Sequence, residues 1–250
     1  MVKKMSEVKK LMEQFEMDDK FKELLLLEQG SDEWLAARRG RLTASGVCDL
    51  MKSGRKKDEF FGKTAMNYIM QRFSSGLVSE EPNITSQAMQ WGNDHEQEAF
   101  EIYKDFFLSD PANNLNDYDV KQVGFVCSEV FPEHVGCSPD GIITENGIAV
   151  GCLEIKCPFD SGVHVETLLK KDLPERWKDK YYAQMQMNML ITRTSWCAYM
   201  SYDPRMLDDE HEVVIIRFDV DVDFMKDLVD RLRKAVEIMK QWEKELENEV

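Results

Sequence analysis

An acid and a lysine two residues apart mark the centre of the chain. Glu154 and Lys156 lie in the run LEIKCP, residues 153–158, where apolar residues alternate with the two charges. On a strand, such side chains leave the same face about 7 Å apart, so an acid and a cation would share one pocket. Burying both charges is costly unless they pair or hold a ligand, so the pattern indicates either a salt bridge or a functional site.

Asp140 can join this pair if the hairpin between the two segments has the right register. It lies in the run SPDG, residues 138–141, and thirteen residues separate it from Glu154. A two-residue Asn146-Gly147 turn with an unbulged ladder would set Asp140 opposite Leu153, because one step of register flips every side chain. We therefore predict a three-residue loop, 145–147, with a left-handed Gly147, which sets Asp140 opposite Cys152 and diagonal to Glu154.

Two carboxylates and an amine at one point need a partner for the negative charge. Oxygen-only ligands favour a hard cation such as magnesium or manganese. The bare spacing is a weak signal, because many acidic chains satisfy it by chance. Its placement on strands, with Pro139, Gly141 and Pro158 around it, favours a functional site over a structural salt bridge.

Local patterns predict the elements that must position these residues. Ser31 and Gly40 bracket a short helix, 32–39, as an N-cap and a stop. Apolar spacing and turn residues predict the other elements. They are helices from near Ser45, at 62–74, about 91–106, 177–191 and 222–249, and strands within 121–127, 134–156, 196–202 and 212–219. This order predicts an α/β fold, a mixed central β-sheet flanked by helices.

Bulk properties limit the class of protein. With 250 residues and 43% hydrophobic content, we expect a single domain over 1–250, with a frayed helix in residues 1–20. No run is long and apolar enough to cross a bilayer and the start does not resemble a signal peptide, so we expect a cytoplasmic protein without a membrane partner. The six cysteines contain no C-x-x-C pair, which argues against a disulfide framework.

The net charge of -15 argues against a nucleic-acid partner until its distribution is considered. Residues 38–63 contain eight basic and three acidic side chains, a local charge of +5, so the remainder carries -20. Such segregation suits one phosphate-facing surface on an otherwise repulsive exterior. A solvated basic loop would give the same pattern, and both interpretations stay open here.

Six blocks of sequence together resemble the phage lambda exonuclease family of viral-type recombination nucleases, within the PD-(D/E)XK superfamily. They are residues 34–45, Trp91-Gly92 with Glu96, 138–141, 153–158, 183–186 and 202–206. The resemblance implies a restriction-endonuclease-like core and a magnesium-dependent 5'-to-3' exonuclease acting on double-stranded DNA. Such an enzyme releases 5' mononucleotides and leaves 3' single strands for recombination by strand annealing.

The resemblance also implies roles for individual residues. Asp140, Glu154 and Lys156 would be catalytic, with Lys156 orienting or deprotonating the attacking water, and Gln184 would hold the scissile phosphate or the water. The implied metal ligands are Glu96, Asp140, Glu154 and the backbone carbonyl of Ile155, for two Mg²⁺ ions with Mn²⁺ as a substitute. Paired cations would supply a nucleophile at neutral pH and stabilise charge on both attacking and leaving oxygens.

Four residues match a pocket that receives the 5' phosphate in the family: Arg38, Thr43, Ser45 and Ser138. A guanidinium offers a bidentate fork for phosphate, and hydroxyls near a helix start lie where an anion is favoured. Without the resemblance, Ser45 is an N-cap and Arg38 a cation at a helix C-terminus.

The resemblance further implies a homotrimeric ring around DNA with free 5'-phosphorylated ends, a single-strand annealing protein as partner, and the host cytoplasm as location if the protein is phage-encoded. No cysteine follows Cys197, so we expect no iron-sulfur cluster. Two alternatives stay open: an endonuclease of restriction or repair type, and a catalytically inert DNA-binding module.

Overall fold

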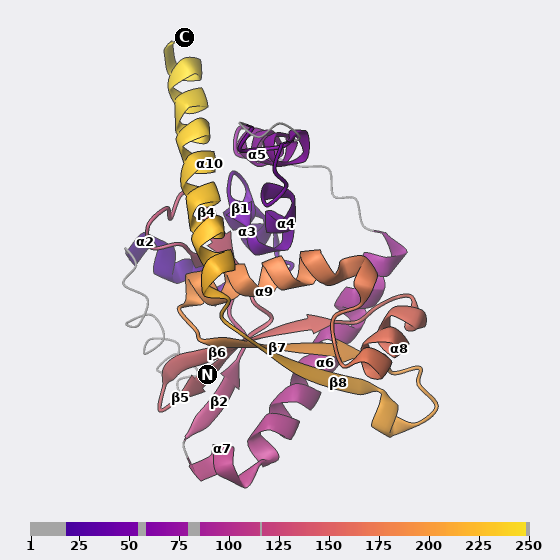
Figure 1. Cartoon of the computed structure of the whole chain (residues 1–250). Coiled ribbons are helices and arrows are strands. Elements are labelled where there is room, and N and C mark those ends of the chain that lie inside the picture. The colour runs from indigo at the N-terminus through magenta and orange to yellow at the C-terminus, as the bar shows by residue number, and fades with distance from the viewer. Residues whose placement is uncertain (1–18, 55–58, 80–85, 116, 249–250) are drawn as a thin grey trace.

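The computed structural model describes residues 19–54, 59–79, 86–115 and 117–248 (Figure 1). The helices are α2 (Asp19–Lys22), α3 (Asp32–Arg38), α4 (Val47–Leu50), α5 (Lys63–Ser75), α6 (Gln87–Ser109), α7 (Pro111–Leu115), α8 (Ser161–Lys170), α9 (Lys178–Thr192) and α10 (Val222–Asn248). Short 3-10 turns are η1 (Glu23–Leu26), η2 (Ala44–Gly46), η3 (Glu175–Trp177) and η4 (Asp209–His211). The frayed helix expected over residues 1–20 lies outside the described residues, apart from the start of α2.

The strands form two sheets, and the larger one carries the hairpin that the sequence singled out. The strands are β1 (Leu42–Thr43), β2 (Tyr118–Lys121), β3 (Val126–Cys127), β4 (Val135–Cys137), β5 (Gly141–Glu145), β6 (Ile148–Lys156), β7 (Trp196–Tyr202) and β8 (Val213–Asp219). The larger sheet has the order β2-β5-β6-β7-β8, with β6 and β7 parallel and the other pairs antiparallel. The expected mixed sheet flanked by helices is confirmed.

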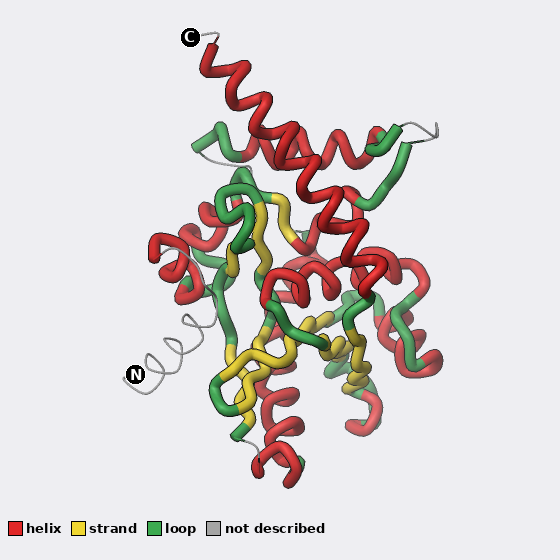
Figure 2. The backbone as a smooth tube through the Cα atoms, turned by 60° about the vertical axis from the view of Figure 1, so that its left-hand side comes forward, coloured by secondary structure: helices red, strands yellow, loops and turns green. Residues whose placement is uncertain are grey.

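Helices α6 and α9 cover opposite faces of this sheet (Figures 1 and 2). Alternate residues of β6 therefore enter different cores. Leu153 and Ile155 pack with Phe100 of α6, whereas Cys152 belongs to the core that contains Met185 of α9. Because side chains two apart share a face, Glu154 leaves β6 on the α9 side.

The hairpin register differs from the predicted one. Glu145 pairs with Ile148 across a two-residue Asn146-Gly147 turn, in which both residues have positive φ, 50° and 79°. This is the tight turn that Asn-Gly favours, so the predicted three-residue loop is wrong. The ladder then shifts, from Thr144 opposite Ala149 to Ile143 opposite Gly151, which leaves one extra residue in β6.

The extra residue in β6 nevertheless puts Asp140 and Glu154 on the same face of the sheet, through a register that differs from the predicted one. Gly141 lies opposite Leu153, and continuing that register by one residue sets Asp140 level with Glu154 rather than opposite Cys152. A bulge shifts the pairing by one residue, so it reverses which side chains face each other beyond it. The two carboxylates therefore leave the same side of neighbouring strands.

The smaller sheet, in the order β1-β4-β3, brings the N-terminal segment beside the hairpin. Leu42 pairs with Val135 and Thr43 with Gly136 in parallel. The preceding α3 begins at an N-cap, because the Ser31 hydroxyl accepts a hydrogen bond from the Trp34 N–H at 3.2 Å. Gly40, at φ 72°, follows this helix, so the predicted start and stop are both confirmed.

Three helices differ from the expected pattern. The helix expected to open near Ser45 begins at Val47 as α4, and Gly46 stands at its N-cap, so Ser45 does not cap it. The Ser86 hydroxyl caps α6, which begins at Gln87 rather than near residue 91. Helix α8 was not predicted; the Asp160 carboxylate caps it, and buried His164 anchors it through Ser201 of β7, 2.8 Å away. In the described part of the chain, no helix combines the length and apolar character needed to cross a bilayer.

Candidate active site

Asp140, Glu154 and Lys156 lie together around the end of β6. The Ile155 N–H donates to Asp140 Oδ2 at 2.5 Å. Lys156 Nζ donates to Glu154 Oε1, and Asn188 Nδ2 of α9 donates to Glu154 Oε2 at 2.8 Å. The Glu154 side chain has no exposure to solvent, whereas the Lys156 side chain is 23% exposed. The amine therefore forms the solvent-facing part of a site whose carboxylate lies beneath it.

Negative charges are crowded in this site. Burial raises the pKa of Asp140 well above its usual range, and the charges of Glu154 and Glu96 act in the same direction. Burial also raises the pKa of Glu96, with a further contribution from Glu154. Burial alone would lower the pKa of Lys156, but the Glu154 and Asp140 carboxylates outweigh it and raise that pKa.

The structure places Glu96, and not its acidic neighbours, beside the hairpin. Glu96 lines one pocket with Ile155 and Lys156, whereas Glu98 and Glu101 are exposed. The adjacent His95 stacks on Trp91 at 3.8 Å between ring centroids, and its Nδ1 lies 2.8 Å from the Trp91 carbonyl oxygen. This contact accounts for His95 as a packing residue of α6.

The donor set matches a hard cation, although the described ranges contain no group of three or more His, Cys, Asp or Glu side chains placed to hold a metal ion. Asp140, Glu96 and Glu154 offer only oxygen ligands, and a cation would relieve their mutual repulsion. Both oxygens of Glu154 already accept hydrogen bonds from Lys156 and Asn188. Asn188 Oδ1 is buried and has no hydrogen-bond partner among the described residues, which leaves another oxygen beside this carboxylate.

The four residues expected to bind a 5' phosphate lie together. Arg38 donates to Ser45 Oγ at 3.0 Å and to Ser138 Oγ at 3.3 Å. Thr43 Oγ1 lies 3.3 Å from Ser45 Oγ. The Trp34 indole donates to Ser138 Oγ at 3.0 Å, and its ring lies 4.2 Å from the Arg38 guanidinium carbon. Arg38, Thr43, Ser45 and Ser138 form the Arg38 cluster, which presents a guanidinium and three hydroxyls at one place.

Within the described residues, no carboxylate forms an ion pair with Arg38, although the charge of Glu154 acts on its guanidinium. Burial lowers the pKa of Arg38 to about 10, and the nearby Arg72 contributes to this effect. The guanidinium thus remains charged at neutral pH. Arg72 donates to the carbonyl oxygens of Arg38 and Arg41, at 2.6 and 2.8 Å, and so fixes the backbone behind the cluster.

The basic segment 38–63 is not one continuous phosphate-facing surface. Arg41 donates to the Pro132 and Ala37 carbonyl oxygens, at 2.9 and 2.6 Å, and Arg39 donates to the Ser79 carbonyl. The expected contribution of residues 55–58 lies outside the described residues. Of the described arginines in this segment, Arg38 is the one that donates to the hydroxyls of Ser45 and Ser138.

Residues 33–195 match the YqaJ-like viral recombinase domain. The chain belongs to that family. Its structure is similar to that of LHK-Exo in complex with dAMP, with a TM-score of 0.69, 26% identity, and coverage of 88% of this chain and 97% of that chain. No curated protein sequence matches it significantly.

Two further solved structures share the fold of this YqaJ-like protein. The alkaline exonuclease LHK-Exo from Laribacter hongkongensis matches with a TM-score of 0.65 and 24% identity, over 88% of this chain and all 100% of that one. A phage related exonuclease from Haemophilus somnus 129PT matches with a TM-score of 0.62 and 13% identity, over 82% and 96%. The restriction-endonuclease-like core implied by the sequence is confirmed.

Three contacts in the YqaJ-like fold were missed by sequence reasoning: those of Asn188, Tyr181 and Trp34. Asn188 lies one helical turn after Gln184, so both point to one side of α9, and this spacing was the available signal. Gln184 itself is buried, and its proposed role at the phosphate stays a prediction. Tyr181 places its ring centroid 5.5 Å from Lys156 Nζ.

Proposed function

We propose that this protein is a divalent-metal-dependent exonuclease that digests double-stranded DNA from 5'-phosphorylated ends. Family membership and fold make it a nuclease of recombination; the direction, metal and substrate belong to the proposal. The observation that carries it is the loop 138–140. Ser138 of this loop contacts Arg38, and Asp140 accepts from the Ile155 N–H between Glu154 and Lys156. The proposed terminal-phosphate site and the acid site, made by Asp140, Glu154 and Lys156, would therefore meet within this loop.

Different residues would bind the metal, orient the attacking water and hold the phosphate during phosphodiester hydrolysis. Asp140, Glu154 and Glu96 would hold Mg²⁺, or Mn²⁺ in its place, and the bound cations would generate a nucleophile from water and stabilise the attacking and leaving oxygens. The Lys156 ammonium would donate to the attacking water or to a phosphate oxygen, which orients the reacting groups and offsets developing charge. Gln184 would hold the phosphate through its amide.

The Arg38 cluster would select the end of the strand. A terminal 5' phosphate carries more negative charge than an internal phosphodiester, and the guanidinium can bind two of its oxygens at once. Ser45, Ser138 and Thr43 would donate to the remaining oxygens. Because LHK-Exo was solved with dAMP, a DNA mononucleotide, we include release of 5' mononucleotides in the proposal.

Assembly is a separate part of the proposal. A chain with a net charge of -15 must keep its acidic surface away from DNA. A homotrimeric ring with an internal DNA channel would do so, and a single-strand annealing protein would take up the 3' strand. Light scattering after size exclusion tests the ring, and a monomer that remains fully active would remove it.

A linear duplex labelled at one 5' end tests the function directly. The duplex, with and without a 5' phosphate, is incubated in magnesium or chelator, beside a covalently closed circle. We expect mononucleotides from the linear duplex in magnesium only, released faster when the phosphate is present. Cleavage of the circle would point to an endonuclease instead, and binding without any cleavage would point to an inert DNA-binding module.

A further inference from the structure

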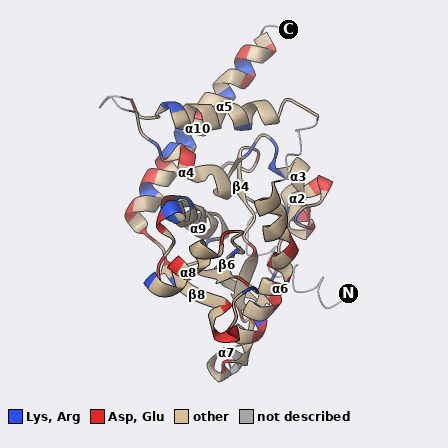
Figure 3. Ribbon diagram, turned by 90° about the vertical axis from the view of Figure 1, so that its right-hand side faces the viewer, with Lys and Arg blue, Asp and Glu red and all other residues tan. Residues whose placement is uncertain are grey.

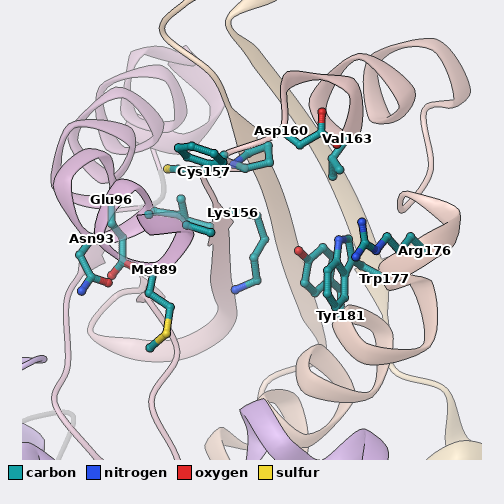
Figure 4. A pocket seen from close by; sticks show the side chains of 15 residues that line it. Met89, Asn93, Glu96, Lys156, Cys157, Asp160, Val163, Arg176, Trp177 and Tyr181 are labelled. Atoms are coloured by element: carbon teal, nitrogen blue, oxygen red, sulfur yellow. The ribbon is translucent and has the colours of Figure 1, made fainter. Parts of the chain in front are cut away.

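A pocket of about 510 Å³ opens beside the Lys156 amine (Figure 4). One wall contains Glu96 of α6, and the opposite wall contains Trp177, Tyr181 and Arg176. The volume lies in the range of pockets that take small organic ligands, about 300–1,000 Å³. The proposed chemistry uses the Glu96 side and Lys156, and it leaves the aromatic wall without a role.

Tyr181 lies beside Lys156, and Trp177 lies beside Tyr181. Tyr181 places its ring centroid 5.5 Å from Lys156 Nζ, and the Trp177 ring stacks on Tyr181 at 6.2 Å with an interplanar angle of 21°. Trp177 ends η3 and stands immediately before the first residue of α9, where it is half-buried. The backbone thus holds a large flat ring at the pocket edge with one part open to solvent.

Two cations flank the same ring. The Arg176 guanidinium carbon lies 5.1 Å and Lys180 Nζ 5.5 Å from the Trp177 ring centroid. Residues 170–180 contain five basic and three acidic side chains in a chain that is acidic overall, and Figure 3 shows blue segments near the start of α9. Among the acids, Asp172 pairs with Lys178 and Asp179 with Lys52, whereas no described acidic group forms an ion pair with Arg176 or Lys180.

We propose that Trp177, backed by Tyr181, is a stacking platform for the nucleobase of the nucleotide being released, with Arg176 and Lys180 contacting the adjacent backbone phosphates. Aromatic rings beside cations bind single-stranded nucleic acid without sequence preference, because every base has a flat face. The base of the terminal nucleotide would lie on Trp177, its 5' phosphate in the Arg38 cluster, and the scissile phosphate on its 3' side near Lys156. This inference rests on the proposed exonuclease function and adds a base-binding subsite to it.

The test compares 5'-terminal nucleotides with and without a base. Under single-turnover conditions, we expect the wild-type protein to release a 5'-phosphorylated abasic terminal nucleotide about tenfold more slowly than an ordinary one. Trp177→Ala should lose about the same factor on ordinary ends and show no further loss on abasic ends. Trp177→Phe should keep most of the difference, because phenylalanine retains a flat ring.

Trp242→Ala is the matched control, because it removes an indole that packs on Phe73, at 5.3 Å, instead of lining the pocket. Its ratio of rates on ordinary and abasic ends should equal that of the wild-type protein. Equal wild-type rates on the two ends would overturn the platform without using any variant. A full base preference retained in Trp177→Ala would overturn it as well.

A binding measurement separates failure of this inference from failure of the exonuclease function. If the wild-type protein degrades no linear duplex in magnesium, the function fails, and the platform is then judged by equilibrium binding. We expect dAMP to bind about tenfold more tightly than deoxyribose 5-phosphate and to quench tryptophan fluorescence, and Trp177→Phe to lose the quenching. Equal affinity for dAMP and deoxyribose 5-phosphate would by itself contradict stacking of the base on Trp177.

Discussion

The acid site and the Arg38 cluster adjoin one short loop, residues 138–140, yet they are built in different ways. The acid site takes Asp140, Glu154 and Lys156 from a single hairpin, with Glu96 added from α6, so most of its geometry depends on local register. The Arg38 cluster joins Arg38 and its neighbours to Ser138 across about a hundred positions of sequence, through the parallel pairing of β1 with β4. Neighbouring sites can thus depend on unrelated features of the fold.

The two sites also carry opposite charges. In the acid site, burial and mutual repulsion raise the pKa of Asp140 and Glu96. In the cluster, burial and Arg72 lower the pKa of Arg38. Each site therefore favours a ligand of the opposite sign, a cation in the first and an anion in the second. If this contrast is correct, changes in the acid site will mainly lower turnover, whereas changes in the Arg38 cluster will mainly lower the preference for a 5' phosphate.

The largest effect is expected from Lys156→Ala. Removing the amine eliminates the donor that would orient the water and offset charge in the transition state, so turnover should fall at least about 100-fold. Binding to duplex, measured by fluorescence anisotropy in chelator, should survive. Lys170→Ala, which removes an exposed lysine paired with Glu166, is the matched control and should leave turnover unchanged.

Loss of Lys156 also leaves the buried Glu154 without its cation, so thermal melting must accompany the rate measurements. Lys156→Arg keeps the charge and provides a second, better-folded variant that should still turn over poorly. Turnover within about twofold of the wild-type rate in either variant would contradict the assignment of the acid site.

A smaller and more selective effect is expected from Arg38→Ala. Charge-assisted hydrogen bonds contribute about 1.5–3 kcal/mol, so preference for phosphorylated over unphosphorylated 5' ends should fall roughly 10- to 100-fold. The rate on unphosphorylated ends should change little. Arg39→Ala, beside it but bonded to the Ser79 carbonyl, is the control, and an equal loss of preference there would remove the assignment.

Asn188→Ala tests whether the acid site depends on a contact outside its hairpin. The change removes the hydrogen bond to the fully buried Glu154, which should lower the free energy of unfolding by about 1–3 kcal/mol and turnover by about tenfold. The preference for 5' phosphate should stay the same. Gln186→Ala, which breaks bonds to Asp219 and Asp221 instead, should lose stability but keep the turnover of each folded molecule.

Asp203→Asn should have the smallest effect, and it should be limited to stability. Arg205 donates to Asp203 at 2.7 Å and to the carbonyl oxygens of Pro158 and Phe159, at 3.0 and 3.1 Å, so this ion pair fixes the chain that follows β6. We expect a loss of about 1 kcal/mol, or roughly 2–4 °C in Tm, at neutral pH. The 5'-phosphate preference should not change.

The effect of Asp203→Asn should depend on pH. Burial alone would raise the pKa of Asp203, but hydrogen bonds from Arg205 and Ser161 outweigh it and lower that pKa. Because the folded-state pKa lies below the unfolded value of about 3.9, the stabilisation is present above that value and is lost as pH falls through the folded-state pKa. A gap between variant and wild type that widens below pH 4 would be inconsistent with this ion pair.

Elements with strong local patterns could be predicted from the sequence. Strand β7 was expected over 196–202 and has those bounds, and α10 begins at the expected residue, 222. The start of α3 was marked by Ser31. The hairpin register could not be predicted, because an Asn-Gly turn and a bulge farther along β6 act together and only the turn leaves a clear local signal.

From residue types and spacing, the sequence by itself predicted two acids and a lysine on neighbouring strands, whereas the grouping of Arg38 with three hydroxyls came from the resemblance to a known family. The tertiary structure alone decided how those groups meet. It joined Arg38 to Ser138, placed Asn188 against Glu154, and set Trp177 across the pocket from Glu96. Residue types and short-range spacing are local properties, whereas these contacts depend on strand pairing and helix packing between segments far apart in the chain.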